Sequence, residues 1–181
     1  MPQGTERLSR VLRWVLLAGA VAWPVLTVAV FMNLEWALQA LGPASLLPAG
    51  ADAEAIGPVT AATRWLGLGV AAVPTALTSA MLLTLSALFG GYARGEVFTH
   101  ASVHRIRRVG LLLLVRELLA PLTGAAMTMV LTMNNPPGQR MASVGLDDSN
   151  VTLVVTALML MVAARVMDRA RELHEDAVLT I

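Results

Sequence analysis

The chain has 181 residues, of which 56% are hydrophobic and only 14% are charged, and its formal net charge is +1. A soluble domain carries about 25% charged residues, so this composition argues against an ordinary water-soluble fold. Because the chain contains no cysteine, disulfides, thiolate metal sites and cysteine nucleophiles are excluded.

Four uninterrupted apolar blocks cover about residues 11–32, 65–89, 109–133 and 151–167. A hydrocarbon core is crossed by about 20 helical residues, and backbone groups in lipid must be satisfied within their own segment, so each block should be a helix. The blocks do not alternate apolar with polar residues as barrel strands do. The sequence therefore predicts an all-α polytopic membrane protein, a four-transmembrane-helix bundle with a single membrane domain over residues 1–181.

The first block follows a basic segment, but its apolar run is longer than the roughly 7–15 residues of a signal peptide. We therefore expect a retained anchor. The stretch "LEWALQAL" that follows predicts a short interfacial helix, with Trp36 at the level of the lipid headgroups. The later polar loop, "NNPPGQRMASVGLDDSN", is typical of turns.

The arginines are distributed unevenly between the two sides of the predicted bundle. Ten of the 13 precede the first block, lie between the second and third, or end the fourth, whereas Arg64 and Arg140 lie in the opposite loops. Cytoplasmic segments of membrane proteins carry an excess of basic residues. We therefore expect both termini, the loop 90–108 and a C-terminal helix 168–181 to be cytoplasmic.

Small residues recur at helical spacing within the spans, which lets helix backbones approach closely in lipid. This pattern predicts packing between the spans, and it equally suits self-association between copies of the chain. The residues concerned are Ala18, Ala22, Ala72, Ala76, Ala80, Gly124, Thr128 and Thr132. Pro74 and Pro121 also fall inside spans, where proline removes a backbone donor and kinks a helix.

Arg116 and Glu117 are adjacent charged residues inside the third block. Charge at that depth is costly and suggests function by default. Neighbouring residues on a helix point about 100° apart, so we expect Glu117 to pair with an arginine of another helix or to stay neutral. Structural pairing is one reading of these two residues, and a path for a proton or solute is the other.

His100 and His104 are spaced i, i+4 and could share a metal, but no third ligand is evident in the sequence. Methionines cluster late in the chain, and the pairs Met127/Met129 and Met159/Met161 are two residues apart. Such pairs point to nearly opposite sides of a helix. They therefore favour core filling over a copper site.

The sequence lacks the motifs of common enzyme chemistry, including a Gly-rich phosphate loop, a nucleophile elbow and HExxH. We therefore expect neither enzymatic activity nor a bound cofactor. The arginines are not interleaved with aromatic residues, which argues against direct binding of nucleic acid. The lipid bilayer is the expected environment.

The stretch "RGEVFTHASVHRIRRVG", residues 94–110, is a basic and polar patch between apolar blocks. Thr99 can cap a helix that starts near His100. Val103 and Ile106 share one face of that helix, and Arg105 and Arg108 share another. This pattern predicts a short amphipathic helix before the third span, with its arginines near anionic headgroups.

The segments "GEVFTHASVHRIRRVG" and "RARELHEDAVLTI" resemble two motifs of a family of small bacterial membrane proteins catalogued as a domain of unknown function. The matching positions are Gly95, Glu96, Phe98, Thr99, Arg105, Arg107, Arg108, Gly110, Glu175, Asp176, Leu179, Thr180 and Ile181. The resemblance implies a four-helix bundle in the bacterial plasma membrane. It also implies frequent genetic neighbourhood with a small Cro/CI-type helix-turn-helix regulator.

From this resemblance we hypothesise that the cytoplasmic face binds a partner, such as that regulator, and holds it at the membrane. The candidate partner-binding residues are Glu96, Phe98, Thr99, Arg105, Arg107, Arg108, Asp168, Glu172, Glu175 and Asp176. The alternative is a subunit of a transporter or channel that uses Glu117 and Arg116. A structural subunit of a larger membrane complex is a third reading.

Overall fold

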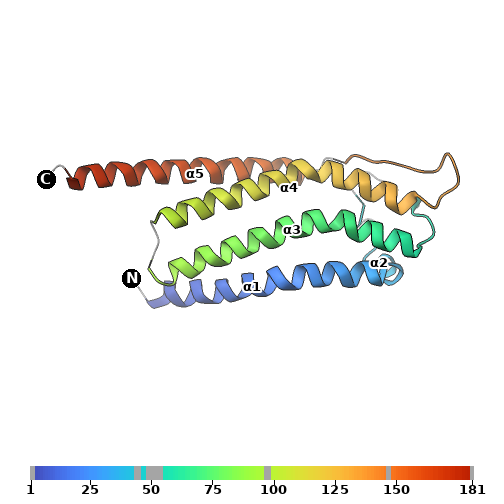
Figure 1. The fold of residues 1–181 in the computed structure, drawn as a ribbon, viewed down its shortest axis with the longest axis horizontal. Helices are drawn as coiled ribbons and strands as arrows, with labels where there is room; N and C mark the ends of the chain where they lie inside the picture. The colour runs from blue at the N-terminus through green and yellow to red at the C-terminus, as the bar shows by residue number, and fades with distance from the viewer. Residues whose placement is uncertain (1–2, 43–45, 48–54, 96–98, 146–147, 180–181) are drawn as a thin grey trace. The chain divides into compact units, whose positions relative to one another are not determined.

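The computed structural model describes residues 3–42, 46–47, 55–95, 99–145 and 148–179, and it describes side chains from residue 7 to residue 170 of these ranges. The described residues form five α-helices and no strand. The helices are α1 (Gln3–Met32), α2 (Leu34–Leu41), α3 (Ala61–Tyr92), α4 (His100–Thr132) and α5 (Asp148–Leu179) (Figure 1). The all-α prediction is confirmed.

Four of these helices are long and apolar enough to cross a membrane, in the ranges Arg7–Met32, Ala61–Tyr92, His100–Thr132 and Asp148–Ala170. Only 11 to 22% of the most apolar window of each helix is buried within the protein. A soluble protein rarely exposes continuous apolar surface of this kind, whereas lipid solvates it. The four predicted spans are therefore confirmed, together with the short helix predicted at "LEWALQAL", which is α2.

Two helices continue beyond the apolar blocks that predicted them. The short amphipathic helix expected before the third span is the first part of α4, and the C-terminal helix expected after the fourth span is the last part of α5. Residues 101–109 and 168–179 contain neither glycine nor proline, so nothing in these segments interrupts helical hydrogen bonding. Most of the predicted loop 90–108 is therefore helical.

The chain divides into two compact units, and each long helix contributes residues to both. Unit 1 comprises Met1–Val21, Thr78–Val115 and Thr152–Ile181, and unit 2 comprises Ala22–Leu77 and Arg116–Val151. Unit 1 therefore contains the first residues of α1 and α4 and the last residues of α3 and α5. The loop between α3 and α4 and both chain ends belong to this unit.

In unit 1, α4 and α5 approach closely at a glycine. A Cβ atom added at Gly110 would lie 3.0 Å from the Ala157 carbonyl oxygen and 3.0 Å from Met161 Cγ. A larger residue at position 110 would force the two helices apart, and Ala157 itself is fully buried. Gly110 thus sets the spacing between α4 and α5.

Unit 2 is built around four buried apolar side chains, Phe31, Leu34, Met127 and Leu131. Phe31 packs against α3 where the helix has Gly67, because a Cβ atom there would lie 2.5 Å from Phe31 Cε1. Leu34 is fully buried, so the short helix α2 packs its first residue into this core. Apolar contact between α1, α2 and α4 therefore organises the unit.

Two asparagines at the end of α4 hold the segment before α3 in unit 2. Asn134 Nδ2 donates to the Pro58 carbonyl (2.8 Å) and to Thr63 Oγ1 (3.0 Å), and Asn135 Nδ2 donates to the Ala55 carbonyl (2.7 Å). Two of these bonds satisfy backbone carbonyls of the segment before α3, which have no partner within a helix. The "NNPPG" loop is thus a structural clasp as well as a turn.

Some of the small residues predicted to pack between helices are buried, and others are exposed. Thr128 and Thr132 are buried in unit 2, where each hydroxyl donates to a carbonyl one turn earlier in α4. The packing prediction holds for them. By contrast, Ala18, Ala22 and the pair Ala72 and Ala76 are exposed, so these alanines do not pack within their units as expected. Spacing alone does not show which face of a helix is covered.

Candidate functional site

The N-terminus of α4 has the cap that the sequence predicts. The backbone N–H of Ser102 donates to Thr99 Oγ1 at 3.2 Å, and α4 begins at His100. The preceding turn ends at Gly95, whose φ of +82° favours glycine. Thr99 therefore satisfies a backbone donor at the start of the helix and is accounted for by folding.

The first turns of α4 separate apolar from basic side chains as predicted. Val103 is 4% exposed and Ile106 is half-buried, whereas Arg107 and Arg108 are exposed. Arg105 is half-buried. The apolar face of this segment packs within unit 1 and the basic face remains available for a partner or for lipid.

Arg107 and Asp168 line one cavity of about 300 Å³ in unit 1, together with Arg165 and apolar residues of α5. The Oδ1 atom of Asp168 is buried with no hydrogen-bond partner among the described residues. It lies 3.9 Å from His100 Nδ1, within ion-pair range if the histidine is protonated but too long for a hydrogen bond. Two of the candidate partner-binding residues thus converge.

The structure does not describe the side chains of the remaining candidates for partner binding. Glu96 and Phe98 lie outside the described residues. The side chains of Glu172, Glu175 and Asp176 also lie outside them, although the backbone of α5 is helical to Leu179.

The histidines and methionines considered for a metal site lie on helices. His100 and His104 are both exposed on α4, and the described residues contain no group of three or more His, Asp or Glu side chains that could hold a metal ion. Met127 is 9% exposed, whereas Met129 is 57% exposed. The two methionines therefore point to different sides of α4, as their spacing predicts.

The pairing predicted for Glu117 is wrong. Its carboxylate forms an ion pair with Arg116, its own neighbour in α4, through Oε1 and Nη1. The two side chains leave the helix in different directions, but that of Arg116 is long enough to reach the Glu117 carboxylate. Glu117 is 4% exposed, and its second oxygen, Oε2, accepts a hydrogen bond of 2.7 Å from Asn150 Nδ2.

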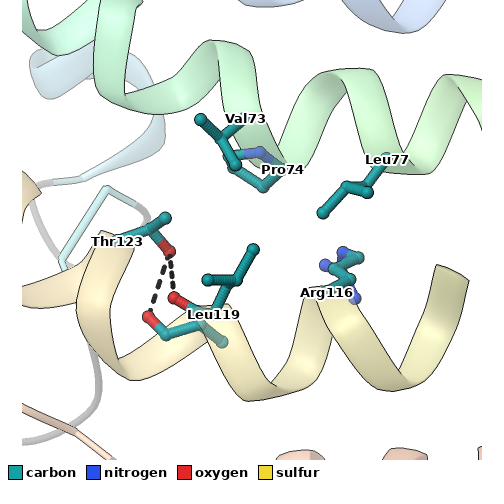
Figure 2. A pocket seen from close by; sticks show the side chains of 7 residues that line it. Val73, Pro74, Leu77, Arg116, Leu119 and Thr123 are labelled. Carbon is teal, nitrogen blue, oxygen red and sulfur yellow. Dashed lines mark hydrogen bonds between the residues drawn. The ribbon is translucent and has the colours of Figure 1, made fainter.

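Arg116 also lines a cavity of about 140 Å³ in unit 2, between α3 and α4 (Figure 2). The other lining residues are mostly apolar, and they include Pro74 of α3 and Ala120, which precedes Pro121 of α4. Thr123 closes one end, and its hydroxyl donates to the carbonyls of Leu119 and Ala120 at 3.1 Å each. Arg116 is thus the charged residue of an otherwise apolar cavity.

Asn150 was missed by sequence reasoning. It lies at the start of α5, 33 residues from Glu117, and one polar residue beside an apolar block carries no signal of its partner. Its amide joins α5 to α4 within unit 2. Because both oxygens of Glu117 have donors, the buried charge is compensated on each side.

These observations define the class of the protein, a multi-pass helical membrane protein with four candidate membrane-spanning helices. Residues 48–181 match the family described as "Protein of unknown function (DUF2975)", and the chain belongs to that family. The resemblance inferred from the sequence to a family of unknown function is therefore confirmed. No curated protein and no solved structure matches the chain.

Proposed function

We propose that the protein is non-enzymatic and binds a cytoplasmic protein partner through the end of α5, holding that partner at the plasma membrane. The observation that carries this proposal is the unbroken course of α5 to Leu179. Five of the nine residues in "RELHEDAVL", 171–179, are ionisable, so this part of the helix is unsuited to lipid. It extends α5 by about 13 Å at 1.5 Å per residue.

The acidic residues of this segment recur at helical spacing. Asp168, Glu172, Glu175 and Asp176 stand at positions i, i+4, i+7 and i+8, which places them along one side of a helix. A negative stripe of this kind complements a basic protein surface, such as that of a small helix-turn-helix regulator. Asp168, the first residue of the stripe, has a side chain that is 43% exposed.

The orientation needed for this role follows from charge. The sequence ranges of unit 1 carry ten arginines and six acidic residues, a formal charge of +4, whereas those of unit 2 carry three and six, a charge of −3. The excess of arginine favours a cytoplasmic location for the helix ends and the termini in unit 1. The acidic stripe of α5 belongs to this unit.

The test is membrane fractionation of a bacterial strain that expresses the full chain together with a small Cro/CI-type helix-turn-helix regulator. With the unaltered chain, we expect the regulator in the membrane fraction. Replacing the stripe by Asp168→Asn, Glu172→Gln, Glu175→Gln and Asp176→Asn should move most of it to the soluble fraction, since the complementary charge is lost.

A matched control neutralises acidic residues in the ranges of unit 2 through Asp52→Asn, Glu54→Gln and Asp147→Asn, and this variant should retain the regulator. If the regulator fractionates identically with all three chains, docking through α5 is contradicted.

A further inference from the structure

Arg105 presents an unsatisfied donor inside unit 1. It lies in the second turn of α4, and its Nη1 atom is buried with no hydrogen-bond partner among the described residues. A guanidinium is always charged in proteins and has five N–H donors but no acceptor. Leaving such a donor buried and unpaired is costly, so the position of Arg105 suits an anionic ligand.

Arg105 lines two cavities, and other basic side chains line both. One, of about 310 Å³, is also lined by Arg13 and Arg94, and the other, of about 470 Å³, by His104 and Arg108. The described residues that line them include no acidic side chain. Arg105 thus lines one cavity with Arg13 and the other with Arg108, and the described lining residues include no carboxylate to compensate these three charges.

Both cavities also have an apolar wall. Leu83 and Ala87 of α3 line each of them, and Leu17 of α1 extends the wall in the smaller one. These residues lie within two candidate membrane spans. A ligand that fits such a space combines an anionic group with hydrocarbon, as an anionic phospholipid does, and basic pockets between membrane helices bind such headgroups.

The backbone of α3 makes room for one of these arginines. A Cβ atom added at Gly90 would lie 3.4 Å from Arg13 Cδ and 3.5 Å from its Nε. The side chain of Arg13 thus packs directly against α3 at Gly90, where a bulky residue would compete with it for space. The Ser86 hydroxyl also donates to the Arg13 carbonyl at 3.1 Å, which ties this residue of α1 to α3 beside the cavity.

We propose that Arg105, which lines both cavities, binds the phosphate of an anionic phospholipid, with Arg13 and Arg108 adding positive charge on the two cavity walls. The acyl chains of the lipid lie along Leu83 and Ala87. Arginine suits this role because its planar fork donates two parallel hydrogen bonds to phosphate oxygens. This inference concerns lipid and does not depend on the acidic stripe of α5 or on its partner.

The test is native mass spectrometry of the full chain in a non-ionic detergent, titrated with phosphatidylglycerol, phosphatidylcholine or inorganic phosphate. We expect a phosphatidylglycerol adduct at concentrations where phosphatidylcholine gives none. Arg105→Gln should weaken this adduct roughly tenfold, the loss of one charge-assisted hydrogen-bonding group. Arg105→Lys, which keeps the charge, should weaken it less.

Two control variants show whether weaker lipid binding is specific to this site. One removes a positive charge elsewhere, and the other places leucine at a different glycine of α3. Arg7 is an exposed arginine of α1 that lines neither cavity, so Arg7→Gln should leave the adduct nearly unchanged. Gly90→Leu should weaken it by displacing Arg13, whereas Gly69→Leu, at a glycine of α3 with open space around it, should not.

Equal binding of the two lipids, or unchanged phosphatidylglycerol binding in a folded Arg105→Gln chain, would overturn the proposal. So would displacement of the lipid by inorganic phosphate at equal concentration, because the ligand would then be the free anion. Circular dichroism of each variant establishes that it is folded.

Discussion

Units 1 and 2 draw on the same long helices but use their polar residues in opposite ways. In unit 2 the polar side chains bond to one another, as in the Asn134 and Asn135 clasp and in the Glu117 carboxylate held by Arg116 and Asn150. In unit 1, Arg107 and Arg108 are exposed and Arg105 faces two cavities. The long-range polar contacts of unit 2 join its own segments, whereas several basic side chains of unit 1 are exposed or line cavities.

Among the substitutions that test this comparison, replacing Glu117 in unit 2 should cause the largest loss of stability. Glu117→Ala leaves the charge of Arg116, which is 37% exposed, without its carboxylate inside a candidate membrane span, and breaking such a pair destabilises a protein by about 3 kcal/mol. We expect the free energy of unfolding to fall by about that amount in equilibrium denaturation of the purified chain. The double variant Arg116→Leu/Glu117→Leu should recover most of the loss, because it removes both charges together.

The same residue separates a structural role from transport. Glu117→Gln keeps an oxygen that can accept from Asn150, so a structural role predicts that the variant folds and supports any solute flux of the native chain. If reconstituted vesicles show a solute flux that disappears in a folded Glu117→Gln chain, the result favours a transporter and contradicts a purely structural role for Glu117.

A smaller effect is expected from the core of unit 2. At Gly67, a Cβ atom would lie 2.5 Å from the Phe31 ring, so Gly67→Leu overpacks the core and should lower the free energy of unfolding by about 1–3 kcal/mol. Gly69→Leu lies two residues further along α3 in open space. It should change stability by less than about 1 kcal/mol, and in the stabilising direction, because leucine is the better helix former. An equal loss of unfolding free energy in the two variants would show that the contact between Gly67 and Phe31 does not limit stability.

The fold follows from the sequence more closely than the site does. Hydropathy identifies all four spans, because lipid requires long apolar helices, and Thr99 is recognisable as a cap from local spacing alone. Hydropathy does not give the ends of α4 and α5, since a helix continues past its apolar part until glycine, proline or a turn stops it. Each of these features depends on residues that are close together in the sequence.

The contacts that define the site join distant parts of the chain. Asn150 and Glu117 are 33 residues apart, and Asn135 and Ala55 are 80 apart, so no local pattern indicates either pair. The Arg116–Glu117 pair was excluded on helix geometry, an argument that neglected the reach of the arginine side chain. The cavities beside Arg105 likewise depend on how α1, α3 and α4 pack in unit 1.

The most direct test of the account is the accessibility of single cysteines, which the cysteine-free chain allows without further change. Ala142, after α4, and Ala170, in α5, are both exposed, and each can be replaced by cysteine in cells treated with a membrane-impermeant maleimide. The arginine excess of unit 1 predicts that Ala142→Cys is labelled in intact cells, while Ala170→Cys is labelled only after permeabilisation. The reverse pattern would contradict the proposed orientation and, with it, a cytoplasmic partner for α5.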